Sequence, residues 1–187
     1  MNNHSTRLDT YRIEAMGCTV LTSSAEQLFY TVYFIIHIPL TIFIDSTICF
    51  PPMTETLNSM IEWHIAANND FLLLEKPSWF YWMVILELIF QLPAFFYFIK
   101  NMTVFNQGNN DSTKEVKAQK LTKRKTVARL LKLYGLNASL TSLFCIWVIY
   151  QRGYYPATGL PLNSMDKFKL IAYYTPTFLI PLRLCML

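Results

Sequence analysis

The chain has 187 residues, of which 53% are hydrophobic and only 15% are charged. Soluble domains carry about 25% charged residues, so this composition argues against a soluble globular domain. The formal net charge of +4 is concentrated, because eight of the sixteen Lys and Arg residues lie between Lys114 and Lys132. Next to apolar stretches, such a run is typical of a segment that flanks a membrane, so we expect no nucleic-acid partner.

The first 27 residues form a polar N-terminal extension (1–27), which we expect to lie in the cytosol. Residues 1–25 have no apolar core behind a basic start, which predicts that there is no cleavable signal peptide. The four cysteines along the chain are widely spaced and show no CxxC or Cys/His pattern. We therefore expect no disulfide framework, no metal site and no cofactor.

Four apolar stretches of about 20 residues follow the extension, each long enough to cross about 30 Å of hydrocarbon as a helix. They are apolar on most faces, unlike the one-sided helices of a soluble bundle. The predicted fold is an all-α membrane protein with a bundle of four transmembrane helices. The expected spans are Leu28–Phe50, Trp79–Ile99, roughly Leu130–Tyr150, and Phe168–Leu187.

The connections between these stretches differ in charge. Residues 51–78 contain four acidic residues and one Lys, whereas residues 101–132 contain eight basic and two acidic residues. Basic loops remain in the cytosol, so we expect a basic cytosolic loop at 101–128 and both termini on that side. Residues 51–78 should then face the lumen.

Ionisable residues occur well inside the first two stretches, where they are costly and often functional. His37, Thr41 and Asp45 recur at i, i+4 and i+8, so they share one face of a helix. Glu87 and Gln91 have the same spacing on the second helix. Both acids should lie in the lumenal half of the membrane.

The other two helices offer polar residues as well. The third has Tyr134, Asn137 and Thr141, and the fourth has Tyr173, Tyr174 and Thr177. Facing polar stripes predict a partly polar, lumen-side cavity within the membrane. Prolines within the spans, among them Pro39 and Pro93, should bend the helices and leave room for that cavity.

Two carboxylates in a dry pocket cannot easily both ionise. We expect Asp45 and Glu87 to share one proton and to leave one buried negative charge, which a cationic amine or a carbocation-like centre could neutralise. The alternative is that polar residues only hydrogen-bond the helices together. Such contacts do not require two acids, so the presence of this pair favours a functional role over a purely structural one.

Four strings of the apolar stretches and the acidic connection are specific enough to compare with known families: HIPLTIFID at 37–45, DFLLLEKPSWF at 70–80, ELIFQLP at 87–93 and YTPTFLIP at 174–181. They resemble the sigma-2 receptor branch of the EXPERA-domain family. The similarity runs from about residue 28 to residue 187, the predicted EXPERA-like four-helix domain.

This resemblance implies a protein of the endoplasmic reticulum membrane whose cavity binds sterols and cationic amphiphilic small molecules, and which can form homodimers. It implies that Asp45 pairs with the ligand amine, that Glu87 is its protonated partner, and that Asp70 holds the lumenal loop. Further lining residues would be Gln91, Tyr134 and Thr141. Thr177 departs from the family motif, which has an aromatic residue there.

Three functions remain open. The first is a non-catalytic binding protein for sterols and lipid amines, serving sterol homeostasis or the quality control of membrane proteins. The second is a sterol double-bond isomerase with Asp45 and Glu87 as its acid/base pair. The sterol isomerase of the same superfamily has a His one helical turn before the acid that corresponds to Asp45. This chain has Thr41 at that position, which argues against the isomerase. The third is a proton-coupled transporter. Transporters usually contain inverted repeats and more membrane spans, and this sequence shows neither.

Overall fold

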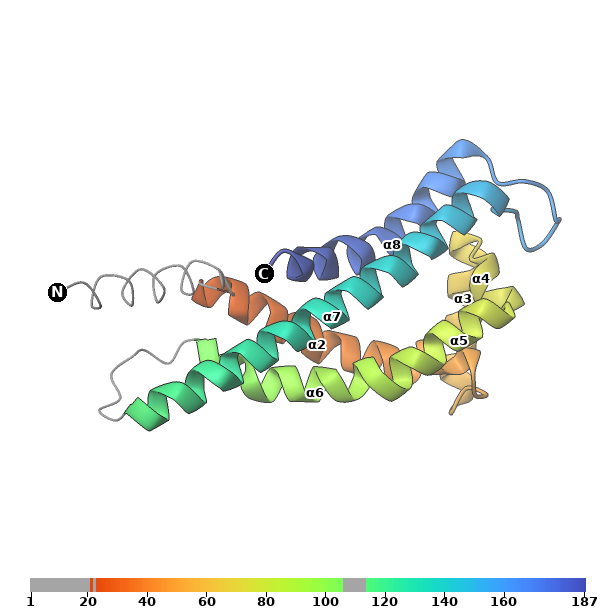
Figure 1. The fold of residues 1–187 in the computed structure, drawn as a ribbon. Coiled ribbons are helices and arrows are strands. Elements are labelled where there is room, and N and C mark those ends of the chain that lie inside the picture. Colours follow the sequence, from red (N-terminus) through yellow and green to blue (C-terminus); the bar gives the residue numbers. More distant parts are fainter. Residues whose placement is uncertain (1–20, 22, 106–113) are drawn as a thin grey trace.

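The computed structural model describes residues 21, 23–105 and 114–187, so most of the extension at 1–27 lies outside the described residues. The described chain is helical, apart from its connections and one isolated antiparallel bridge. Figure 1 shows long, roughly antiparallel helices with short helices gathered at one end. The α-helices are α2 (Ser24–Phe43), α3 (Glu55–Asn68), α4 (Phe71–Glu75), α5 (Ser78–Leu86), α6 (Leu92–Asn101), α7 (Lys114–Arg152) and α8 (Ser164–Cys185).

Three helical stretches are long and apolar enough to cross a membrane: Ser24–Ile48, Ser78–Phe105 and Ala118–Arg152. They correspond to the first three expected spans. The fourth expected span corresponds to α8, which has 22 residues and therefore sufficient length. Since charged residues near both of its ends lower its hydropathy, the crossing by α8 stays a prediction. The all-α membrane fold is confirmed.

The first helix is shorter than predicted, because α2 ends at Phe43 and a 3₁₀ turn, η1 (Asp45–Ile48), follows it. Hydroxyl groups near this break donate to the backbone: Ser46 Oγ to the Ile42 carbonyl at 2.5 Å, and Thr47 Oγ to the Ile44 carbonyl at 2.6 Å. Such bonds compete with the regular helical pattern. Asp45 thus begins η1 instead of continuing the face of α2.

The second span is interrupted by a π-helical turn, η2 (Glu87–Gln91), which joins α5 to α6. The Leu92 N–H donates to the Glu87 carbonyl, five residues earlier. Pro93, the next residue, has no N–H to donate, so it cannot complete a regular turn here. Figure 1 shows the resulting bend between α5 and α6. Such π-turns often occur at functional sites.

The expected basic loop at 101–128 is helical in its described parts, while residues 106–113 lie outside the described residues. After the 3₁₀ turn η3 (Met102–Phe105), α7 begins at Lys114 and continues for 39 residues. The first 21 residues of α7 contain no Gly or Pro, and many are strong helix formers. Val127, Ala128 and Leu131 in this part are buried, so packing also stabilises the helix.

Two apolar clusters form the core. The first joins α2, α6, α7 and the C-terminal end of α8, and its centre consists of Phe34, Phe95, Phe98 and Tyr134, with ring centroids 5.2–5.9 Å apart. The second lies beneath α3 and α4, around Phe71 and its neighbours. Residues of both clusters line the cavity described below.

At Gly135, α7 lies close to the backbone of α8. A Cβ atom there would lie 2.6 Å from the Pro181 carbonyl oxygen and 3.0 Å from Leu184 Cβ. We expect Gly135→Ala to force the helices apart and to lower the stability by about 1–3 kcal/mol. Thermal unfolding in detergent would measure this, with exposed Leu136→Ala as the neighbouring control. An unchanged melting temperature for Gly135→Ala would contradict this packing.

Candidate functional site

A cavity of about 300 Å³ lies inside the bundle, at the end nearest α3 and α4. Its walls come from α2, η1, α3, α4, α5, η2, α7 and α8. Leu40 and Tyr173 line the cavity and are also 40% and 52% exposed, so it reaches the outer surface beside α2 and α8. Of the expected site residues, the lining includes His37, Asp45, Asp70, Glu87, Gln91, Tyr134, Thr141 and Thr177.

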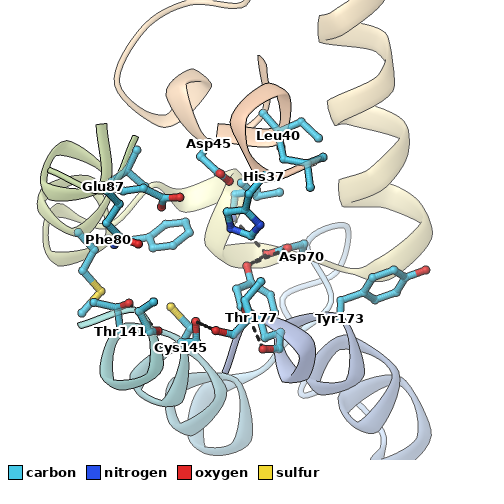
Figure 2. Close-up of a pocket in the computed structure, with 18 of the residues that line it drawn as sticks. His37, Leu40, Asp45, Asp70, Phe80, Glu87, Thr141, Cys145, Tyr173 and Thr177 are labelled. Atoms are coloured by element: carbon cyan, nitrogen blue, oxygen red, sulfur yellow. Dashed lines mark hydrogen bonds between the residues drawn. The ribbon is translucent and has the colours of Figure 1, made fainter. Parts of the chain in front are cut away.

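Asp45 and Glu87 are two of the three carboxylates that line this cavity, with Asp70 as the third (Figure 2). Asp45 comes from η1 and Glu87 from the π-turn, so each lies at a break in a spanning helix. Thr41 is fully buried, and its Oγ donates to Glu87 Oε1 at 2.9 Å. Among the described residues, no Lys or Arg nitrogen lies within 4.0 Å of either carboxylate.

The inner wall of the cavity is aromatic. His37 stacks near Tyr33, with ring centroids 4.8 Å apart, and meets the edge of Phe95 at 5.5 Å. Tyr134 Oη donates to Tyr33 Oη at 3.3 Å. This wall offers apolar faces, two phenol hydroxyls and one imidazole to a ligand.

Asp70 holds the α3–α4 segment to the bundle. Its Oδ1 accepts from the Leu72 and Leu73 N–H groups at 3.1 and 3.2 Å, which caps α4. The Tyr174 hydroxyl of α8 donates to Oδ2 at 3.0 Å, and His64 Nε2 of α3 lies 3.5 Å from the same oxygen. One carboxylate therefore joins three elements, and it is 1% exposed.

Two further hydrogen bonds connect the end of α4 to other parts of the protein. Lys76 Nζ donates to the Thr47 carbonyl at 2.6 Å, and Tyr154 Oη donates to Glu75 Oε1 at 2.5 Å. Burial and the Glu75 carboxylate raise the pKa of Tyr154 to about 12. The phenol therefore remains protonated, and this donor persists at physiological pH.

The remaining predicted residues do not line the cavity. Thr41 contacts Glu87 but is not part of the cavity wall. Pro39 and Pro93 are exposed on the outer faces of their helices. His64 and Tyr33 line the cavity although sequence reasoning did not select them. Tyr33 could have been found from its spacing, because it precedes His37 by four residues on the same helix.

Comparison with known proteins identifies the relatives of this chain. Residues 56–186 match the EXPERA family, the expanded EBP superfamily. The efficient mitochondria targeting-associated protein 19 of Saccharomyces cerevisiae is 47% identical over 164 residues, which are 86% of this chain and 95% of the yeast protein. Sigma intracellular receptor 2 of Xenopus tropicalis is 27% identical over 158 residues, 82% of each chain.

The human sigma intracellular receptor 2 is 37% identical over a shorter stretch of 65 residues, 34% of this chain and 37% of the receptor. The resemblance to the sigma-2 receptor branch is therefore confirmed. Together with the family match over most of the bundle, these similarities show that the chain belongs to the EXPERA family.

Proposed function

We propose that this protein is a non-catalytic, intramembrane binding protein for sterols and cationic amphiphiles. The observation that carries the proposal is a cavity within the spanning helices with a largely apolar or aromatic wall and three carboxylates. Of these, Asp70 is bound by Leu72, Leu73 and Tyr174, which leaves Asp45 and Glu87 for a ligand. A sterol or the tail of an amphiphile would contact the apolar wall. The amine of a cationic ligand would pair with the carboxylates.

Charge balance supports the cationic class of ligand. A buried carboxylate without a counter-ion is costly in a medium of low dielectric constant. Since the described residues place no Lys or Arg beside Asp45 or Glu87, a ligand ammonium would supply the missing charge. The proposal assigns the negative charge to Asp45 and a shared proton to Glu87.

Accessibility from the lipid supports the amphiphilic class. Cavity residues on α2 and α8 are partly exposed on the outer surface of the bundle, as noted for Leu40 and Tyr173. A ligand dissolved in the bilayer would enter there without crossing water. The volume of about 300 Å³ lies at the lower limit of typical small-molecule pockets.

The binding proposal is tested by purifying the full chain and identifying bound lipids by mass spectrometry. We expect sterols to co-purify and to be displaced by a cationic amphiphile. Conversion of an added sterol into its ring double-bond isomer by the purified protein would instead support the isomerase. Absence of both sterol binding and amine binding would refute the proposal.

A second role is suggested by the yeast relative, whose name associates it with efficient targeting to mitochondria and which matches this chain over 95% of its length. We propose that this chain also supports the targeting of proteins to mitochondria. Expression in a yeast strain that lacks the relative should restore mitochondrial import of a reporter. Normal expression without restoration would contradict this role.

For location, we propose a membrane of the endoplasmic reticulum with both termini in the cytosol. Asn101-Met-Thr103 and Asn110-Asp-Ser112 are glycosylation sequons. Asn101 is 5% exposed and its Nδ2 donates to the Tyr97 carbonyl at 2.7 Å, so it is inaccessible; Asn110 lies outside the described residues.

We expect neither sequon to be glycosylated, because their side of the bundle should face the cytosol. The matched control is Pro156→Asn, which completes an Asn-Ala-Thr sequon in the connection between α7 and α8 on the opposite side. That variant should acquire a glycan, seen as a gel shift sensitive to glycosidase. A shift of the unmodified chain that is lost in Asn110→Gln would reverse the orientation.

A further inference from the structure

The first half of α7 carries a basic stripe, which we define as Lys125, Arg129 and Lys132. The three residues follow the spacing i, i+4 and i+7, so they lie on one face of the helix. All three are exposed. Residues 116–132 contain seven basic residues and no acidic residue, so no nearby carboxylate on this helix segment neutralises the stripe.

The length of α7 sets the depth of the stripe in the membrane. Between Lys132 and Arg152 the helix has no charged residue. That uncharged stretch is about 29 Å long at 1.5 Å per residue, which matches about 30 Å of hydrocarbon. Lys132 therefore lies at the boundary of the hydrocarbon, and Arg129 and Lys125 lie about 5 and 10 Å further out. Figure 1 shows the N-terminal end of α7, which precedes the stripe, extending past the end of α6.

The face of the stripe continues along the helix as an apolar surface. Five large apolar residues occupy the same face and are 44–63% exposed: Leu136, Leu140, Leu143, Trp147 and Tyr150. The opposite face of the basic segment packs against the bundle through buried Val127, Ala128 and Leu131. One surface of α7 is thus apolar at the depth of acyl chains and basic at the depth of headgroups.

From this arrangement we propose that the basic stripe binds anionic phospholipid headgroups of the adjacent leaflet. A lipid whose chains contact the exposed Leu136 and Leu140 would place its phosphate beside Lys132 and Arg129. Clusters of Lys and Arg directly next to a membrane span attract anionic lipids by about 1 kcal/mol per residue. The continuity with the lipid-facing surface favours a lipid over an acidic protein.

The test is native mass spectrometry of the full chain, titrated in detergent with phosphatidylserine or phosphatidylcholine. We expect tighter binding of phosphatidylserine, and we expect Lys125→Gln/Arg129→Gln/Lys132→Gln to weaken it roughly a hundredfold. The charge-conserving variant Lys125→Arg/Arg129→Lys/Lys132→Arg should retain the preference. It also controls for misfolding, together with thermal unfolding of each variant.

A matched pair of single variants tests whether lipid binding depends on the stripe or only on the total positive charge of the helix. Lys123 is exposed on the other side of the same helix. Arg129→Gln should weaken phosphatidylserine binding roughly fivefold, whereas Lys123→Gln should leave it unchanged. Equal binding of both lipids, or equal losses in the two single variants, would overturn the proposal. Retained phosphatidylserine binding in the triple variant would also overturn it, because the lipid would then bind away from the stripe.

Discussion

Asp45→Asn should abolish the binding of cationic amphiphiles while the protein remains folded. Asn nearly matches Asp in size but offers a dipole in place of a full charge. Removing one partner of a buried ion pair typically costs about 3–5 kcal/mol, which is roughly a hundredfold to several thousandfold in affinity. Radioligand binding to the purified variant would measure the loss.

Glu87→Gln should have a milder effect, of about tenfold, because Gln retains an oxygen that can accept from Thr41. The hydroxyl of Thr41 can donate and accept, so its 2.9 Å contact with Glu87 fits either protonation state. The relative loss of affinity in the two variants therefore tests which carboxylate is charged and which is protonated. Loss of binding in Glu87→Gln with retention in Asp45→Asn would reverse the two roles, and unchanged binding in both would make the acids structural.

Asp70→Ala should destabilise the protein by about 2–4 kcal/mol, because it removes a helix cap and leaves buried donors unpaired. The stranded groups would be the Leu72 and Leu73 N–H groups and the Tyr174 hydroxyl. Thermal unfolding in detergent would measure the loss.

A matched control for this effect is Thr54→Ala, because Thr54 caps α3 in an exposed position, where Thr54 Oγ accepts from the Leu57 N–H at 3.1 Å. Water can replace that hydrogen bond, so Thr54→Ala should lower the free energy of unfolding by about 1 kcal/mol or less. If Asp70→Ala is no more destabilising than Thr54→Ala, Asp70 does not hold the α3–α4 segment to the bundle.

The sequence was most informative where composition and spacing act together. Long apolar stretches predicted the spanning helices, because a helix must satisfy its own backbone in lipid. The spacing of His37 and Thr41, and the acids within apolar stretches, predicted residues that do lie around one cavity. These features depend on local pattern, which can be counted along the chain.

The features that the sequence did not predict are of two kinds. The end of α2 at Phe43 and the π-turn at Glu87–Gln91 are local rearrangements that helical periodicity does not reveal. The helical basic segment is stabilised in part by the burial of Val127 and Leu131, which depends on tertiary packing. The position of His64 at the cavity also depends on tertiary contacts, because Asp70 joins α3 to α4 and α8.

The central claim is that a sterol or amphiphile occupies this cavity, and photolabelling with a photoreactive sterol tests it most directly. After irradiation of the full chain in membranes, peptide mapping should find labels on cavity residues such as Tyr134 and Thr177, and an excess of cationic amphiphile should prevent them. Labels confined to outward-facing residues such as Leu140 and Trp147, insensitive to the amphiphile, would contradict the account.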